Sequence, residues 1–437
     1  MADLDSTRTN KRYYPLGGRT YHFLGDHRTQ RNWGASNTSF VERDESLKLQ
    51  GFDDYASVVN VEQPGGATRL MAKRDYRDLM PLVKYAKNPK HKKIQELLAR
   101  DRTVQTTLDA RLQVVVGNAV RDTLLRRGVE SASVVVLDAQ SGELRAMVNY
   151  PWPDESVPGQ MSGEILLDRA RYGTYPPGST FKIVTAMAAL DKNPALIEKT
   201  YLCRRLESGR VGNQVEGWGR PVRCFATTPH GDVGLSEALV YSCNAYFAQL
   251  AVDGLGGNAL LSMASRFGID VASPNTPETL RDALHQASFG QGQVLATPLE
   301  MARVAATVSN GGVVPPTTWI ADSGTGERRG TRVLEESQND VIARAMRNVV
   351  IRGTARSGGF GMTVSGKTGT AEVANGASHS WFIGFGAPAS GVGEVAVSVI
   401  VEHGGAGSGA ATRVGHAVFE ACQEVLGQPV VADTQDD

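Results

Sequence analysis

Residues 175–182, Tyr-Pro-Pro-Gly-Ser-Thr-Phe-Lys, constrain the fold of this chain more than any other stretch. The Pro-Pro-Gly turn leads directly into residues 183–190, an apolar run typical of a buried helix. Ser179 therefore lies at the start of a helix, and Lys182 follows one turn later on the same face. A lysine held that close, and partly desolvated, can accept the proton of a serine hydroxyl. The Ser-x-x-Lys pattern alone, however, is equally typical of a serine that only caps a helix.

Two further short motifs follow downstream and change this interpretation. Ser242 and Asn244 stand two residues apart after an apolar, helix-like run, and they supply a hydroxyl and an amide. Lys367 begins the sequence Lys-Thr-Gly-Thr, in which a strand carries a cation beside a glycine that permits close backbone approach. The set Ser-x-x-Lys, Ser-x-Asn and Lys-Thr-Gly, in this order, is the signature of the penicillin-recognising serine enzymes. We therefore favour catalysis over capping at Ser179.

The elements expected around the motifs form an α/β layered domain. In chain order they are a strand at 104–109, a helix at 110–126, a hairpin at 133–150, helices at 235–240 and 245–252, a helix from 298 to about 310, a helix at 340–352, strands around 367, 380–385 and 395–401, and a helix at 414–426. Thr297, Pro298 and Glu300 combine an N-cap, a proline at the first helical position and a capping-box glutamate. Because strands occur near both ends of this region, we expect one antiparallel sheet flanked by helices.

Length and charge limit the classes of function. A chain of 437 residues exceeds one ordinary domain, so we expect one large domain and a smaller one. Lys and Arg total 46 and balance 46 Asp and Glu, which gives no electrostatic basis for binding nucleic acid. Neither a bilayer-spanning apolar run nor a signal peptide is apparent. The sequence as given is expected to be soluble, and any export or anchoring segment would lie outside it.

The cysteines and histidines show no metal-type spacing, so we predict no metal site. Cys203 and Cys224 flank a glycine-rich loop, and the sequence leaves open whether they pair in an oxidising compartment or remain free thiols. Cys243 is interpreted as an inert small residue behind the active site. The two histidines near the motifs, His230 and His379, are expected to have structural roles.

From Val104 to Leu426 the chain resembles the transpeptidase domain of penicillin-binding proteins, closest to the class B, monofunctional type. Beyond the three motifs, the similar stretches are residues 108–113, 135–146, 290–293 with 297–302, and 367–372 with 381–384. The resemblance implies a penicillin-binding-protein/serine β-lactamase-like fold. It implies a partial N-terminal pedestal at 1–103, a transpeptidase domain at 104–428 and a disordered tail at 429–437.

The N-terminal part and one short segment depart from the family pattern. Residues 1–103 read as irregular and polar, with a turn at 13–17, a loop at 32–38 and a helix at 77–100 interrupted at Pro81 and Pro89. This part lacks the opening of a full pedestal, and no glycosyltransferase domain precedes it, which disfavours a bifunctional class A enzyme. Asp168 stands where the family has Asn before Arg, a change expected to alter local hydrogen bonding rather than chemistry.

The resemblance also implies how protons move. Ser179 attacks the carbonyl of the penultimate D-alanine in a D-Ala-D-Ala peptide, and Lys182 accepts the hydroxyl proton. Ser242 relays a proton to the leaving amine, while the charges of Lys182 and Lys367 adjust the proton affinity of the Ser242 hydroxyl. Asn244 holds Lys182 and the substrate's amide backbone. No cofactor is needed.

Substrate binding is implied for the third motif. Lys367, Thr368 and Thr370 receive the substrate carboxylate, and Gly369 lets the backbone approach closely. The backbone N–H groups of Ser179 and Thr370 form the oxyanion hole. The implied partners are peptidoglycan stem peptides, β-lactam antibiotics and a membrane glycosyltransferase of the cell-wall machinery, and the implied location is the extracytoplasmic face of the bacterial membrane.

Three alternatives remain. A β-lactamase would share the acylation step but needs a deacylating base, for which Glu278 is the one candidate we name. A penicillin sensor would acylate and signal, and would need a transmembrane segment. A catalytically dead scaffold is disfavoured because the motif residues are intact.

Overall fold

The computed structural model describes residues 15–25, 41–52, 55, 57–62, 68–153, 163–321, 329–360, 363–389 and 392–427. Among these, the chain forms two compact units. Residues 15–22, 107–319 and 329–427 form the larger unit, and residues 23–106 with 320–321 form the smaller one. The predicted loop at 32–38, the predicted tail at 429–437 and the first two residues of the predicted turn at 13–17 lie outside the described residues.

A five-stranded antiparallel sheet forms the centre of the larger unit. Its strand order is β11 (Val364–Ala371), β12 (His379–Gly386), β13 (Val395–Val401), β3 (Ala132–Asp138) and β4 (Leu144–Tyr150). Strand β13 pairs with β3 in a register that places Ser398 opposite Val135, so the two ends of the unit meet within one sheet. These strands are rich in β-branched residues and are buried along almost their whole length. The predicted sheet is confirmed.

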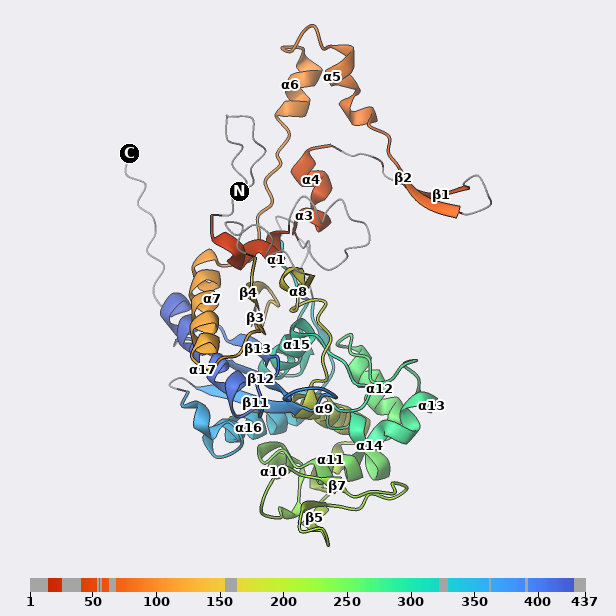
Figure 1. The fold of residues 1–437 in the computed structure, drawn as a ribbon, viewed down its shortest axis with the longest axis vertical. Helices are drawn as coiled ribbons and strands as arrows, with labels where there is room; N and C mark the ends of the chain where they lie inside the picture. Colours follow the sequence, from red (N-terminus) through yellow and green to blue (C-terminus); the bar gives the residue numbers. More distant parts are fainter. Residues whose placement is uncertain are drawn as a thin grey trace. The chain divides into compact units, whose positions relative to one another are not determined.

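Helices cover both faces of this sheet (Figure 1). Helices α7 (Ala110–Leu125) and α17 (Ala410–Leu426) lie together on one side, and α15 (Pro298–Ser309) lies on the other. Helix α15 begins with the predicted capping box, in which the Thr297 hydroxyl accepts from the Glu300 N–H and the Glu300 carboxylate accepts from the Thr297 N–H. Apolar side chains of α7, α17 and the sheet form one continuous core.

The segment that carries Ser179 lies between the sheet and a group of helices. Helix α9 (Lys182–Lys192) is buried from its first residue through Leu190 and follows the short 3-10 helix η3 (Gly178–Phe181). It packs against α12 (Gly257–Ser265), α16 (Glu336–Ile351) and α10 (Leu235–Val240), while η3 packs against β11. A helix this enclosed is stabilised by its packing, which fixes the position of the residues at its start.

A second, smaller sheet was not expected from the sequence. Its order is β7 (Val222–Arg223), β6 (Val211–Asn213), β5 (Tyr201–Arg205) and β8 (Gly231–Val233). Strands β5, β6 and β7 pack on α11 (Asn244–Leu250), the helix that begins within the second motif. This sheet lies at the bottom of Figure 1.

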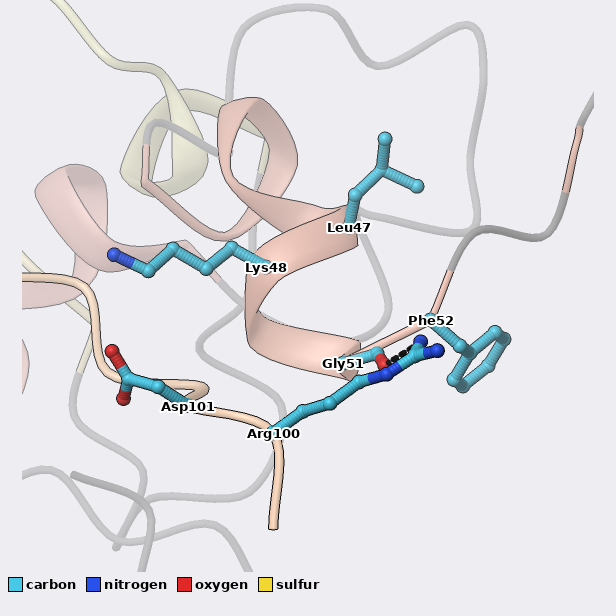
Figure 2. A pocket seen from close by; sticks show the side chains of 6 residues that line it. All are labelled: Leu47, Lys48, Gly51, Phe52, Arg100 and Asp101. Atoms are coloured by element: carbon cyan, nitrogen blue, oxygen red, sulfur yellow. Dashed lines mark hydrogen bonds between the residues drawn. The ribbon is translucent and has the colours of Figure 1, made fainter. Parts of the chain in front are cut away.

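The smaller unit contains α3 (Val41–Asp44), α4 (Ser46–Gln50), the hairpin β1 (Ser57–Glu62) and β2 (Thr68–Lys73), η2 (Arg77–Leu79), α5 (Met80–Lys84) and α6 (Lys92–Leu98). The hairpin is a correction to the irregular structure predicted for this part. Pro81 does not interrupt a helix but lies in the first turn of α5, where its missing N–H has no cost. Figure 2 shows a hollow of this unit, across which Arg100 donates to the Gly51 carbonyl at 2.8 Å.

The remaining elements are η1 (Gly17–Thr20), α1 (Tyr21–Leu24), α8 (Gly163–Leu166), η4 (Pro194–Glu198), η5 (Ala251–Leu255), α13 (Pro277–Leu280), η6 (Arg281–Ala283), α14 (Leu284–Ala287), β9 (Val313–Val314), β10 (Thr331–Arg332) and η7 (Arg356–Gly358). The predicted strand at 104–109 forms only an isolated bridge from Thr106 to Ile320. Helices α16 and α17 each begin four residues before their predicted starts. Across the described ranges, none of the helices has both the length and the apolar character required to cross a bilayer.

Candidate active site

Ser179 lies on a turn that only glycine can make at the preceding position. Gly178 has a φ of +54°, and a Cβ added there would lie 2.5 Å from the Thr370 carbonyl oxygen of β11. Its N–H donates to the Gly290 carbonyl at 2.9 Å. Gly290 itself has a φ of +74°, and a side chain there would overlap the Gly178 carbonyl. The two glycines therefore allow the turn that carries Ser179 to lie against the third motif. The sequence did not reveal this role for Gly290.

Polar anchors hold the segment leading into this turn. The indole N–H of Trp381 donates to the Pro176 carbonyl at 2.9 Å, and the Trp381 side chain is fully buried. The Tyr175 hydroxyl donates to Glu402 Oε1 at 2.6 Å, and the buried Arg169 guanidinium donates to the same oxygen at 2.9 Å. Trp381 is thus a core aromatic that fixes the loop before Ser179.

Lys182 reaches from the nucleophile helix to the second motif. Its Nζ donates to Asn244 Oδ1 at 2.6 Å, to the Ser242 carbonyl at 2.7 Å and to Ser242 Oγ at 3.1 Å. The ammonium is completely buried and lies 5.6 Å from the centre of the Phe247 ring. The structure thus brings the first two motifs into direct contact.

Lys367 approaches the same hydroxyl from the sheet. Its Nζ donates to Ser242 Oγ at 3.0 Å and to the Thr368 carbonyl at 3.0 Å, and the side chain is fully buried. Two lysines from different elements therefore share one serine hydroxyl. The three predicted motifs converge on Ser242.

Burial changes the protonation of both lysines. It lowers the pKa of Lys182 to about 8. It lowers the pKa of Lys367 well below its usual range, and repulsion from Lys182 adds to the effect. Because two ammonium groups beside one hydroxyl repel each other, they titrate as a pair, and one of them can be neutral near physiological pH. A neutral lysine at this place is a base.

The turn that carries Ser242 has an unusual backbone. Ser242 has a φ of +57°, in the left-handed region that favours glycine. Cys243 follows as the N-cap of α11, and the Asn244 side chain donates through Nδ2 to the Arg223 carbonyl at 2.9 Å. Strain of this kind is found at functional sites when surrounding contacts enforce it.

Solvent exposure differs sharply among the residues of the site. Ser179, Ser242 and Thr370 are half-buried, whereas Lys182 and Lys367 are fully enclosed. Within the described part of the chain, the Ser179 hydroxyl makes no hydrogen bond, so it is not engaged with Lys182 in this state. Catalytic hydrogen bonds are often loose before substrate binds. Solvent therefore reaches the three hydroxyl-bearing residues, whereas the two lysine side chains are shielded from it.

The third motif lies on an edge strand beside Ser179. Strand β11 is at the end of the sheet order, so no strand of the described residues pairs with the other side of its backbone. A Cβ at Gly369 would lie 2.8 Å from the Pro177 carbonyl, which explains the glycine. The Thr368 and Thr354 hydroxyls lie 2.6 Å apart, and Thr370 Oγ1 accepts from the Gly407 N–H at 2.9 Å.

Asp168, the departure from the family pattern, is buried away from these motifs. Its Oδ1 accepts from Asn149 Nδ2 at 2.9 Å and from the Arg171 N–H at 3.2 Å. Burial raises the pKa of Asp168 to about 6. The residue takes part in local hydrogen bonding between β4 and the segment before the nucleophile.

Glu278 is not placed to act on an acyl group at Ser179. It is exposed in the first turn of α13 and lines a surface hollow together with Lys192, the last residue of α9. Ser179 precedes the first residue of the same helix, whose 11 residues span about 16 Å. The Glu278 carboxylate therefore lies at the far end of α9 from Ser179.

The fold also gathers thiols that are distant in sequence. The Sγ atoms of Cys203, Cys224 and Cys243 and one ring nitrogen of His230 all lie within 4.8 Å of one another. The fold thus brings together four side chains that show no metal-type spacing along the chain, and the absence of a metal site stays a prediction. The cysteines are free thiols, and Cys203 and Cys224 do not form a disulfide in this structure.

A serine at a helix start, two buried lysines sharing a second serine hydroxyl, and an edge strand beside them define a serine enzyme of the acyl-transfer class. Residues 132–420 match the family model for the penicillin binding protein transpeptidase domain. The chain therefore belongs to the penicillin-binding protein transpeptidase family, and the named relatives are of its class B, monofunctional type.

Similar proteins support this assignment over most of the chain. Peptidoglycan D,D-transpeptidase PbpA of Mycobacterium tuberculosis is 30% identical over 76% of this chain and 74% of its own length. Peptidoglycan D,D-transpeptidase MrdA of Acinetobacter baumannii is 28% identical over 94% of this chain and 65% of its own length. The structure of penicillin-binding protein A from M. tuberculosis, as an imipenem acyl-enzyme complex, superposes with a TM-score of 0.70 at 26% identity, covering 95% of this chain and 94% of that one.

Proposed function

We propose that Ser179 is the nucleophile of a peptidoglycan D,D-transpeptidase, and that Lys182, Ser242, Asn244 and Lys367 handle the protons of its reaction. The family and the relatives make the chain a serine D,D-transpeptidase that β-lactams acylate. The observation that carries the residue assignment is the Ser242 hydroxyl, which Lys182 and Lys367 approach at 3.1 and 3.0 Å. Among the described residues, Ser242 Oγ is the atom at which hydrogen bonds from the first and third motifs meet the second.

In the acylation step, Lys182 in its neutral form takes the Ser179 proton as Oγ attacks the carbonyl of the penultimate D-alanine. The C–N bond to the terminal D-alanine then breaks, and Ser242 passes a proton to the leaving amine. Because Ser242 Oγ lies between two lysines, either of them can replace that proton. An amine of a second stem peptide then takes the acyl group, which closes the cycle and forms the cross-link.

The third motif would bind and polarise the substrate. The backbone N–H groups of Ser179 and Thr370 are suited to form the oxyanion hole, since the glycine at 178 brings their segments together. Thr368 and Thr370 offer hydroxyls to the terminal carboxylate, and the positive field of Lys367 favours its binding. Gly369 keeps the strand close to the nucleophile turn.

The setting of the reaction follows from the relatives. They are named for action on peptidoglycan, which lies outside the cytoplasm, and we place the activity of this chain at the outer face of the bacterial membrane. Residues 1–103 would include a partial pedestal, although their described segment 15–22 belongs to the larger unit. Residues 104–428 would serve as the transpeptidase domain and 429–437 as a tail. A membrane glycosyltransferase that supplies nascent glycan strands is the proposed protein partner.

The test is turnover of a synthetic stem peptide ending in D-Ala-D-Ala, with and without an acceptor amine. The wild-type chain should release D-alanine and form the transfer product, and Ser179→Ala should do neither. Ser309→Ala, which changes a serine at the end of α15, serves as the control and should turn over normally. Normal turnover by Ser179→Ala would contradict the assignment.

A β-lactamase is distinguished by the lifetime of its penicilloyl adduct. The position of Glu278 at the far end of α9 predicts an adduct that persists in intact-protein mass spectra. An adduct that disappears as penicillin is consumed would instead require a deacylating base.

A further inference from the structure

A buried cluster of three thiols and an imidazole lies directly behind the second motif. Cys203 is on β5, Cys224 directly follows β7, His230 directly precedes β8, and Cys243 is the N-cap of α11. The three cysteines are at most 9% exposed, and their Sγ atoms and one His230 ring nitrogen lie within 4.8 Å of one another. The mechanism uses none of these four side chains.

The sulfur separations fit one occupant and exclude a disulfide. Cys224 Sγ lies 3.8 Å from Cys203 Sγ and 3.8 Å from Cys243 Sγ. A disulfide would need about 2.05 Å. Sulfurs bound at about 2.3 Å to a tetrahedral zinc ion lie about 3.8 Å apart. The two Sγ–Sγ separations of 3.8 Å match those of ligands around a common centre.

The fourth member of the cluster is a histidine with an unsatisfied nitrogen. Nδ1 of His230 is buried and has no hydrogen-bond partner among the described residues. The ring stacks on Tyr241, with the centroids 5.9 Å apart and the planes 14° from parallel, which limits its rotation. A buried nitrogen without a partner costs free energy unless something binds it.

We propose that Cys203, Cys224, His230 and Cys243 form a structural site for a zinc ion, bound by three thiolates and one imidazole. Three cysteines and a histidine with no fifth ligand are a common closed tetrahedral zinc set. Binding releases the thiol protons to solvent and leaves the imidazole neutral.

Such an ion would join the small sheet to the second motif. The ligands come from three strands or their ends and from the residue between Ser242 and Asn244. The Arg223 carbonyl, one residue before Cys224, accepts from Asn244 Nδ2 at 2.9 Å. A bond from the metal to Cys243 would hold Ser242 at its positive φ of 57°. The metal site stands independently of the proposed function, whereas this positioning of Ser242 rests on it.

The test begins with the metal content of the full chain, purified without chelators and measured by inductively coupled plasma mass spectrometry. We expect about one zinc ion per chain. Cobalt(II) exchanged into the site should give a thiolate-to-cobalt charge-transfer band and the visible bands of tetrahedral coordination. Neither measurement depends on a variant folding.

Variants then assign the ligands. Cys203→Ser and His230→Ala should lose the zinc ion, while Cys422→Ala should retain it, because Cys422 is a buried cysteine of α17 outside the cluster. Wild-type protein that takes up no metal from zinc-containing buffer, or both ligand variants retaining it, would overturn the site. An intact mass lower by two hydrogens under non-reducing conditions, showing a disulfide within the cluster, would also overturn it.

A second readout separates the metal site from the catalytic assignment. Removing zinc with a chelator should slow acylation by benzylpenicillin by about tenfold, as expected for loss of a group that positions a catalytic residue. Bound zinc whose removal leaves acylation unchanged would refute the positioning of Ser242. Zinc-loaded wild-type protein that is never acylated would refute the proposed function while confirming the metal.

Discussion

Two buried clusters, one of lysines and one of thiols, meet at the turn formed by Ser242, Cys243 and Asn244. They differ in how their polar groups are hydrogen-bonded. On the lysine side, each ammonium has hydrogen-bond acceptors, and half-buried hydroxyls lie next to it. On the thiol side, the donors face one another, and the His230 Nδ1 has no partner in the described residues.

This difference separates a reactive site from a structural one. A lysine that is buried but hydrogen-bonded keeps a lowered pKa and can exchange protons with a substrate that reaches the neighbouring hydroxyl. The thiols are buried and contact one another, and neither hydroxyl of the lysine side hydrogen-bonds to them in the described residues. In our proposals, the same three-residue turn supplies chemistry through Ser242 and Asn244, and Cys243 between them holds the turn in place.

Removing the base should give the largest effect on the lysine side. Lys182→Ala is expected to slow acylation by benzylpenicillin by about 10²- to 10⁴-fold, the usual contribution of a general base. The rate is measured with a fluorescent penicillin under pseudo-first-order conditions. Lys192→Ala, at the other end of α9, is the control and should react near the wild-type rate, since among the described residues its Nζ donates to the Gly254 and Leu255 carbonyls, far from Ser242.

Moving the nucleophile turn should have the next largest effect. Gly178→Ala combines a φ of +54° with a Cβ that would lie 2.5 Å from the Thr370 carbonyl, so η3 must shift away from β11. We expect acylation to fall by about 10²-fold, because small misplacements of reacting groups are costly. Gly128→Ala provides the comparison, since its φ is +64° and nothing lies within 4 Å of the added Cβ. Equal acylation rates for the two variants would refute the role of this close contact.

The pH dependence of acylation should report the lysine pair. Below the Lys182 pKa of about 8 the ammonium has no lone pair to accept the Ser179 proton. The rate should therefore rise about tenfold per pH unit well below that pKa and level off above it. Stopped-flow measurement across this range checks the profile, and a flat profile would show that Lys182 is not the titrating base.

The smallest effect is expected at Asp168, outside both clusters. Burial raises its folded-state pKa to about 6, from about 3.9 in the unfolded chain. The folded state therefore binds this proton more tightly than the unfolded chain. The resulting contribution to the free energy of unfolding is fully present below the unfolded-state pKa and is lost as pH rises through about 6. Asp168→Asn should abolish this loss, which is up to about 3 kcal/mol. Urea unfolding of both proteins at several pH values tests it, and parallel stability curves would contradict it.

The lysine cluster could be predicted from the sequence because each of its residues belongs to a short motif. Lys182 is fixed by helical spacing from Ser179, and the capping box at Thr297 and the hairpin of β3 and β4 follow from equally local signals. Such patterns depend on backbone periodicity, which operates over a few residues. The capping box and the hairpin were confirmed for that reason.

The thiol cluster could not be predicted because its members are separated by long, irregular intervals. Cys203 and Cys224 are 21 positions apart, and Cys224 and Cys243 are 19 apart. Their approach depends on the small sheet of β5 to β8, whose strands are two to five residues long and carry little periodic signal. The glycine pair at 178 and 290 was likewise visible only in the fold.

The most direct test of the central claim is to map the acylated residue. Wild-type protein is treated with benzylpenicillin, digested, and analysed by tandem mass spectrometry. We predict that the penicilloyl group lies on Ser179, and that Ser179→Ala carries none. A penicilloyl group on another side chain, or an undiminished adduct in Ser179→Ala, would contradict the assignment of Ser179 as the nucleophile that the two lysines serve.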